Sequence, residues 1–245
     1  MTQQTRSGKW ELYYVGHVCF RVTAPDGTVL FIDPMLDGGF EWEGAREKRL
    51  DPPAFQLPLI EKCDAVLVTH AHGDHYEATT VSHLARDHGS KVLGPPDVIA
   101  DLAGRGVPGE RLITASSGQE FDFGPMKVTA WPNRDSENAQ PCNRFSYSIR
   151  CGDHVIFHGG DSHGPSPTWE PLIGKTDIAM LWPSKVIDVT RWLRPARIVL
   201  MHYGQFRPGK FLCNMDPNYI AGEIRTACPD ANVQIMSVRE TIFLD

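Results

Sequence analysis

Residues 70–75, with the sequence His-Ala-His-Gly-Asp-His, place three imidazoles and one carboxylate directly after the apolar run 65–69. Neutral imidazole nitrogens and carboxylate oxygens are the usual protein ligands of zinc and related divalent ions. A short continuous apolar run is typical of a buried strand, so the polar side chains begin where this strand is expected to end. Gly73 gives the backbone freedom for a tight turn. The segment therefore predicts a metal-binding loop.

Two later polar residues occupy the same kind of position. Asp161 follows the apolar residues 155–157 and a pair of glycines, and His202 follows the apolar run 198–201. Three such strand ends in one chain favour a single site over three unrelated surface positions. We therefore expect one metal centre, and we expect its ligands to come from His70, His72, Asp74, His75, Asp161 and His202.

Strand and helix patterns alternate along the whole sequence. Residues 19–23 and 28–32 are predicted to form a hairpin around the turn residues 25–27, after a first strand at 11–15. Further strands are expected at 65–69, 91–93, 121–131, 145–150, 154–157, 177–181, 197–201 and 233–238, and helices at 77–87, 96–102, 186–193 and 218–227. This order predicts an α/β layered fold. We expect one domain over residues 1–245, made of two similar halves.

Residues 36–58 show no regular pattern and contain Phe40, Trp42 and Phe55. A loop of about twenty residues is long for a compact domain, and such loops often cover or line a binding site. The segment is expected either to lie over the metal centre or to form a contact between copies of the chain, which leaves a homo-oligomer open.

Charge and composition restrict the partners. The formal net charge is −6 and no run of Lys and Arg occurs, which argues against a nucleic-acid partner. No apolar run approaches the roughly 18 residues needed to cross a bilayer, and the polar first ten residues do not resemble a signal peptide. The six cysteines are scattered without a C-x-x-C pair, as expected for reduced thiols in a cytoplasmic protein.

Taken together, these segments resemble the metallo-β-lactamase superfamily, and within it the branch that includes ascorbate-6-phosphate lactonase and uncharacterised hydrolase relatives. The stretches that carry the resemblance cover nearly the whole chain in the family's order. They are Gly16-His17, Cys19-Phe20, Ile32-Asp33-Pro34, residues 69–75, residues 157–161 and residues 201–204. The resemblance implies an αββα sandwich with a metal centre at one edge of the sheets.

The resemblance also implies how the ligands divide between two ions. His70 and His72 would bind the first ion, whereas Asp74, His75 and His202 would bind the second, and Asp161 would bridge them. Asp74 would also take part directly in catalysis. Zinc is the expected metal, with manganese or iron as alternatives. Two such ions polarise a carbonyl or phosphoryl oxygen and activate water as hydroxide.

One ligand that the family normally supplies is missing from this sequence. The third histidine of the first ion would follow the strand at 127–131, but residues 132–136 read Pro-Asn-Arg-Asp-Ser. Three alternatives remain open. Asp135 replaces the histidine, His163 replaces it, or the first position holds no ion and the chain binds one metal.

The function expected from these residues is hydrolysis of a small-molecule ester, lactone, amide or phosphoester by metal-bound hydroxide. An iron-dependent oxygen or redox enzyme on the same fold, or a non-catalytic binding protein, are the alternatives. Several other residues are expected near the site or at the surface. His17, Tyr203 and Trp182 are candidates for the surroundings of the metal, whereas His83 and His88 are expected on a helix surface.

Overall fold

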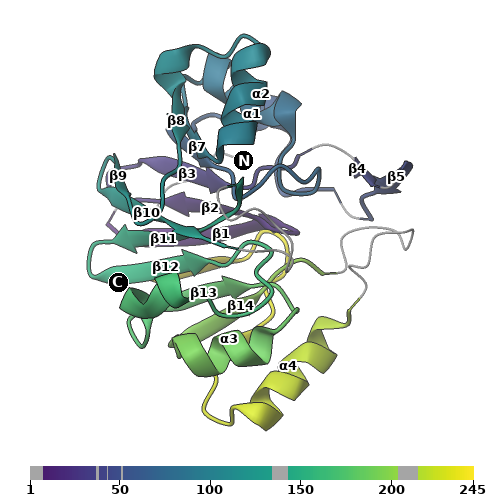
Figure 1. The fold of residues 1–245 in the computed structure, drawn as a ribbon, viewed down its shortest axis with the longest axis vertical. Coiled ribbons are helices and arrows are strands. Elements are labelled where there is room, and N and C mark those ends of the chain that lie inside the picture. Colours follow the sequence, from purple (N-terminus) through teal and green to yellow (C-terminus); the bar gives the residue numbers. More distant parts are fainter. Residues whose placement is uncertain (1–7, 37–38, 43, 51, 134–142, 204–214) are drawn as a thin grey trace.

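A computed structural model of the chain describes residues 8–36, 39–42, 44–50, 52–133, 143–203 and 215–245. Two seven-stranded sheets form its centre, and Figure 1 shows helices on the outer face of each. The first sheet contains β1 (Trp10–Gly16), β2 (Cys19–Thr23), β3 (Val29–Ile32), β6 (Ala65–Leu67), β7 (Lys91–Gly94), β8 (Leu112–Thr114) and β16 (Thr241–Leu244). The second contains β9 (Glu120–Phe123), β10 (Met126–Pro132), β11 (Phe145–Cys151), β12 (His154–His158), β13 (Ile178–Leu181), β14 (Arg197–Leu200) and β15 (Val233–Gln234).

The two sheets follow the same plan. The first runs in the order β16-β1-β2-β3-β6-β7-β8, with antiparallel pairs up to β3 and parallel pairs from β3 to β8. The second runs β9-β10-β11-β12-β13-β14-β15, antiparallel up to β12 and parallel beyond it. The predicted α/β sandwich of two similar halves is confirmed.

The alternation of side chains along each strand divides the core into three layers. In β3, Leu30 and Ile32 pack between the sheets, whereas Val29 and Phe31 face the helices of the first half. In β13, Met180 lies between the sheets and Leu181 faces the helices of the second half. Both faces of the central strands are therefore buried, which explains their continuous apolar sequences.

Four α-helices cover the outer faces. α1 (Ala78–Asp87) and α2 (Pro96–Gly104) pack on the first sheet, and α3 (Val186–Leu193) and α4 (Pro217–Ala227) pack on the second (Figure 1). α3 buries positions 186, 189, 190 and 193, the spacing of one helix face. α4 begins with Pro217 after Asp216, whose side chain accepts a hydrogen bond from the backbone N–H of Asn218. No described helix is long and apolar enough to cross a membrane.

Three segments differ from the sequence prediction. Residues 36–58 contain a hairpin of β4 (Gly39–Trp42) and β5 (Ala45–Lys48), so they are not a structureless loop. The strand expected at 233–238 ends after two residues, and β16 follows it to pair with β1 in the other sheet. β8 has no counterpart among the predicted strands, because its three residues are only half-buried or exposed and have no strong apolar pattern.

Candidate metal centre

The loop that follows β6 is anchored at both ends by backbone hydrogen bonds. The N–H of Phe145, at the start of β11, donates to the carbonyl of Thr69 over 3.0 Å and so joins this loop to the second sheet. The N–H groups of His75 and Tyr76 both donate to the carbonyl of His72. This turn brings the side chains of His70 and His75 to the same side, with ring centroids 4.1 Å apart.

Gly73 lies in that turn for a different reason from the one predicted. Its φ angle is not positive, so the turn does not require the conformational freedom of glycine. A Cβ at this position would lie 3.3 Å from Cβ of Phe40, in the β4–β5 hairpin. The missing side chain therefore allows the hairpin to pack closely against the metal-binding loop.

Asp33, at the end of β3, holds the loop in place from below. Its Oδ1 accepts a hydrogen bond from the N–H of Thr69 over 2.7 Å, and its Oδ2 accepts one from the Thr69 hydroxyl over 2.7 Å. Nδ1 of His75 lies 2.7 Å from the same Oδ2. A proton on Nδ1 is shared with this carboxylate, so Nε2 of His75 faces the centre of the site with its lone pair.

His70 is oriented through Thr69. Its Nδ1 lies 3.0 Å from the Thr69 hydroxyl oxygen, whose own proton is donated to Asp33. Nε2 of His70 then faces Asp161, with 3.6 Å to Oδ2. The buried Nε2 atoms of His70 and His75 make no hydrogen bond within the described part of the chain. Both nitrogens are thus available as ligands.

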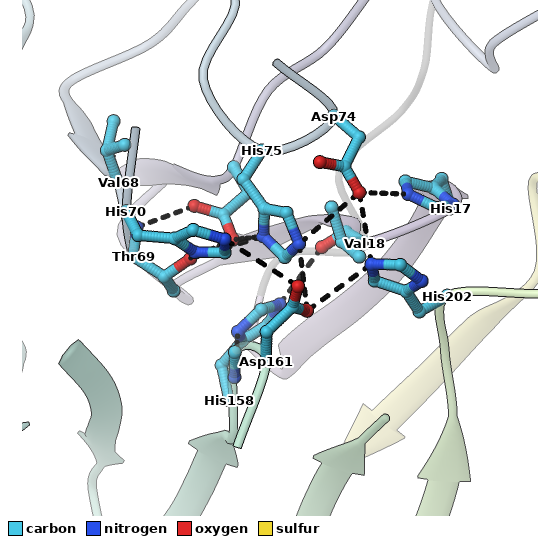
Figure 2. Close-up of polar contacts among 12 residues, drawn as sticks. His17, Val18, Val68, Thr69, His70, Asp74, His75, His158, Asp161 and His202 are labelled. Carbon is cyan, nitrogen blue, oxygen red and sulfur yellow. Dashed lines mark hydrogen bonds and ion pairs between the residues drawn. The ribbon is translucent and has the colours of Figure 1, made fainter. Parts of the chain in front are cut away.

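Four of the predicted ligands form a compact buried cluster (Figure 2). Oδ1 of Asp161 lies 3.0 Å from Nε2 of His75 and 3.3 Å from Nε2 of His202. Oδ2 of Asp74 lies 3.7 Å from the first of these nitrogens and 3.0 Å from the second. Ligands around a tetrahedral ion with bonds of about 2.0 Å are roughly 3.3 Å apart. The separations in the cluster fit such an ion.

Asp161 lies between this cluster and His70. Its Oδ1 faces His75 and His202, and its Oδ2 faces His70. Gly160 precedes it with a φ of +54°, a left-handed conformation that allows the chain to turn sharply as β12 ends. The two oxygens of this carboxylate are therefore placed to serve neighbouring positions, as the resemblance implied for a bridging ligand.

His17 is a further residue of the cluster. Its Nε2 lies 3.2 Å from Oδ2 of Asp74, and its carbonyl accepts the N–H of His202 over 3.0 Å. Burial, with the neighbouring His202, lowers the pKa of His17 to about 3, so its ring is neutral. A group of His17, Asp74 and His202 and another of His70, His75 and Asp161 each have ligand atoms within 4.8 Å of one another.

The electrostatics of the cluster favour a bound cation. Burial opposes a charge on His75, but Asp161, Asp74 and Asp33 outweigh it and raise the pKa of this imidazole to about 10. Burial likewise opposes ionisation of Asp74 and Asp161, but His75 and the other nearby histidines hold both carboxyl pKa values well below the usual range. Ionised carboxylates buried this deeply need positive charge, which a divalent ion supplies when it displaces the His75 proton.

His72 lies at the outer edge and contacts a cation. Its ring centroid is 4.5 Å from that of His70, and its Nε2 lies 3.2 Å from Nη2 of Arg144. Burial, with the adjacent guanidinium, lowers the pKa of His72. Among the predicted ligands that the structure describes, His72 is thus the one whose Nε2 faces a positively charged group.

The alternatives for the missing histidine have different outcomes. Asp135 lies outside the described residues. His163 is exposed, with Nδ1 3.3 Å from the Ser184 hydroxyl and its ring against Trp182, which in turn packs on His202. The structure therefore places His163 on the His202 side of the centre, whereas the missing ligand belongs beside His70 and His72.

The remaining sequence candidates have structural contacts. The Tyr203 hydroxyl donates to the carbonyl of Met236 over 3.0 Å. His83 pairs with Asp87 on α1, and His88 caps the end of that helix, as expected for surface residues. Neither His83 nor His88 belongs to the cluster around Asp161.

Sequence reasoning missed three functional or supporting residues. Asp33 was visible only as part of a family resemblance, and Arg144 carried no signal at all. His158 is fully buried, with Nε2 3.0 Å from the carbonyl of Val18 and Nδ1 accepting the N–H of Gly160. A histidine that ends an apolar strand next to a glycine pair was the only available indication of this role.

Comparison with known proteins agrees with the fold and the site. The model of the beta-lactamase superfamily domain matches residues 28–212, so the chain belongs to this superfamily. A UPF0173 protein of Pyrococcus furiosus is 30% identical over 205 residues, covering 80% of this chain and 84% of the relative. A UPF0173 metal-dependent hydrolase of Polynucleobacter asymbioticus is 27% identical over 265 residues, covering 95% and 85%.

Among solved structures, a metallo hydrolase from the archaeon Ignicoccus hospitalis has a similar fold. Its TM-score is 0.70 at 23% sequence identity, and the match covers 97% of this chain and 99% of the other. The arrangement of two sheets with outer helices is thus shared over the full length of both proteins.

Proposed function

We propose that this member of the beta-lactamase superfamily is a metal-dependent hydrolase that acts on an ester, lactone, amide or phosphoester bond of a small molecule. The observation that carries the proposal is the buried convergence of His75, His202 and Asp74 around Asp161. The names of its relatives agree with metal-dependent hydrolysis but do not identify a substrate.

The donor set suits zinc best, because imidazole nitrogens and carboxylate oxygens at tetrahedral separations are its usual ligands. Manganese and iron accept the same donors, so metal analysis has to decide among them. A divalent ion held by these side chains would lower the pKa of water toward 7 and polarise the substrate's carbonyl or phosphoryl oxygen.

The protein's own groups prepare this reaction by fixing the ligands before substrate arrives. Asp33 sets the proton of His75 on Nδ1, and the Thr69 hydroxyl orients His70. His17 positions Asp74 from the other side. Ligands fixed in this way need little reorganisation when charge develops on the substrate.

Asp74 is the residue that we assign to a direct role in catalysis. Its Oδ2 faces the histidines, whereas its buried Oδ1 makes no hydrogen bond to any described group. The low pKa of this carboxyl makes Asp74 a weak proton acceptor. We therefore assign Oδ1 to orienting the attacking water by accepting its hydrogen bond, with the strongest proton affinity elsewhere.

The β4–β5 hairpin supports the expectation that residues 36–58 cover the site. Phe40 is buried against Gly73, within the metal-binding loop. Trp182 lies on the opposite side, with its ring 5.5 Å from that of His202. Apolar side chains on two sides of the centre favour a substrate of which the bond to be cleaved is accompanied by an apolar part.

The test combines metal analysis with a substrate panel. Purified protein should contain zinc, manganese or iron at one or more ions per chain, and should hydrolyse at least one nitrophenyl ester, lactone, amide or phosphodiester. Chelation should abolish that activity, and the metal should restore it. His75→Ala and Asp161→Ala should abolish activity, whereas the surface control His83→Ala should retain it.

Two results would contradict the proposal. Protein that retains no transition metal when purified and after metal addition would exclude the metal centre. Oxygen consumption by iron-loaded protein without hydrolysis of any member of the panel would favour the iron-dependent alternative.

A further inference from the structure

The side chain of Arg144 reaches the metal-binding loop from the other half of the molecule. Arg144 directly precedes β11, which belongs to the second sheet, and His72 follows β6 of the first. Nη2 of the guanidinium lies 3.2 Å from Nε2 of His72. A guanidinium has only donors, so in this contact the imidazole nitrogen is the acceptor.

A hydrogen bond of this kind uses the atom that a metal would need. A neutral imidazole has one nitrogen with an available lone pair, and the contact with Arg144 engages Nε2 of His72. A metal ion and an N–H group cannot bind the same lone pair. The guanidinium is also permanently charged, so it disfavours a second cation at this position.

The other ligands show the opposite arrangement. His75 and His202 direct Nε2 to the carboxylates of Asp74 and Asp161, and His70 directs Nε2 to Asp161. No positively charged arginine or lysine is paired with any of these nitrogens in the ion pairs of the described residues. The centre is therefore asymmetric, with carboxylates on one side and a fixed cation on the other.

We propose that Arg144 takes the place of the first metal ion by binding His72, so that the chain holds a single divalent ion on Asp74, His75, Asp161 and His202. This inference rests on the proposed function, because it assumes that the centre binds metal. It adds a residue that sets the number of ions and supplies the second positive charge beside the reacting group.

Metal stoichiometry tests the proposal directly. The full-length protein is equilibrated with buffered zinc in excess and its bound metal is counted by mass spectrometry of the intact protein and by elemental analysis. The wild type should bind one ion per chain. Arg144→Ala should bind two, because removing the guanidinium frees His72 beside His70 and Asp161. The double variant Arg144→Ala with His72→Ala should return to one.

Further variants keep this test decisive. Arg144→Met removes the charge but keeps most of the aliphatic length, and it should also bind two ions even if the alanine variant folds poorly. Arg150→Ala, on the same strand but paired with Glu120 at the surface, is the matched control and should bind one. His72→Ala alone should also bind one ion.

The outcomes separate this inference from the proposed function. A wild type that binds two ions and loses one in His72→Ala would overturn the role of Arg144 while leaving a metal hydrolase in place. Both Arg144 variants remaining at one ion would overturn it as well. A wild type that binds no ion, or a His75→Ala variant that keeps its ion, would overturn the proposed metal centre and this inference with it.

Discussion

Nδ1 of His75 lies 2.7 Å from Oδ2 of Asp33 in a contact from which water is excluded. Asp33 belongs to the turn after β3, and His75 to the loop after β6, the neighbouring parallel strand. The carboxyl ends of two adjacent strands thus supply a ligand and the group that orients it. The metal-facing side of the imidazole is fixed by the backbone of the first sheet.

Replacing Asp33 by Asn should weaken metal binding without removing a ligand. The amide keeps the shape of the side chain but loses the charge that holds the His75 proton on Nδ1. Second-shell changes of this kind lower metal affinity by about 10- to 100-fold. Competition with a chromophoric chelator measures the affinity, and Asp26→Asn, in an exposed turn, is the control. An unchanged affinity in Asp33→Asn would show that His75 does not depend on this contact.

His158 is predicted to be structural although it lies next to the centre. Its ring links the end of β12 to the carbonyl of Val18 in the first sheet and is fully buried. His158→Ala should lower the free energy of unfolding by about 2–4 kcal/mol, because it leaves a cavity and an unsatisfied carbonyl. Denaturant titration measures this loss. His83→Ala, on the surface of α1, should change stability by less than about 0.5 kcal/mol.

The metal content of His158→Ala distinguishes this role from ligation. The folded variant should bind the same number of ions as the wild type. Loss of metal without a loss of stability would instead place His158 among the ligands.

Gly39→Ala should disrupt the β4–β5 hairpin. Gly39 has a φ of +154°, and a Cβ there would lie 1.9 Å from the carbonyl oxygen of Glu47 on the paired strand. Because the clash is with backbone, the strands have to separate. We expect faster proteolysis within residues 39–48 and a raised KM, with metal content unchanged. Gly104→Ala, where no atom lies within 4 Å, is the control and should leave both measurements unchanged.

The buried thiols should be unreactive in the folded protein. Burial raises the pKa of Cys63 and of Cys151 to about 12, whereas Cys228 is only half-buried. At pH 8 the folded protein holds both buried thiols protonated, so iodoacetamide should modify Cys228 first and the other two only in denaturant. Mass mapping of the alkylated peptides measures the order. Equal rates at Cys63 and Cys228 would contradict it.

The same pKa shifts give a direction for stability at alkaline pH. The unfolded chain releases its thiol protons near pH 8.5, whereas the folded chain keeps those of Cys63 and Cys151 until about pH 12. The unfolded state therefore binds fewer protons in this window, and the free energy of unfolding falls as the pH rises through it. Denaturant midpoints at pH 8 and pH 10 measure the loss.

Much of the fold was visible in the sequence because central strands and amphipathic helices carry strong patterns. Residues 65–69 and 197–201 are apolar throughout, as buried parallel strands are, and the helix predicted at 186–193 forms over those residues. The β4–β5 hairpin and β16 were missed. Both lie at or beyond the edges of the sheets, where exposed positions weaken the apolar alternation that identifies a strand.

The centre was predictable to the extent that its ligands stand at strand ends. Asp161 and His202 were identified in this way, and the structure places both beside His75. The contact between Arg144 and His72 joins residues 72 positions apart and leaves no local pattern in the sequence. Similarly, a hydrogen-bonding partner such as His17 depends on how the halves pack, which periodicity does not encode.

The ligands around Asp161 come from both sheets, since His75 follows β6 and His202 follows β14. An ion bound by them joins the halves of the molecule as a disulfide would, but reversibly and in proportion to the supply of metal. Fragments divided between β8 and β9 would share that ion, together with the pairing of β1 and β16, as their means of association. Metal supply would then control assembly of the fold as well as its chemistry.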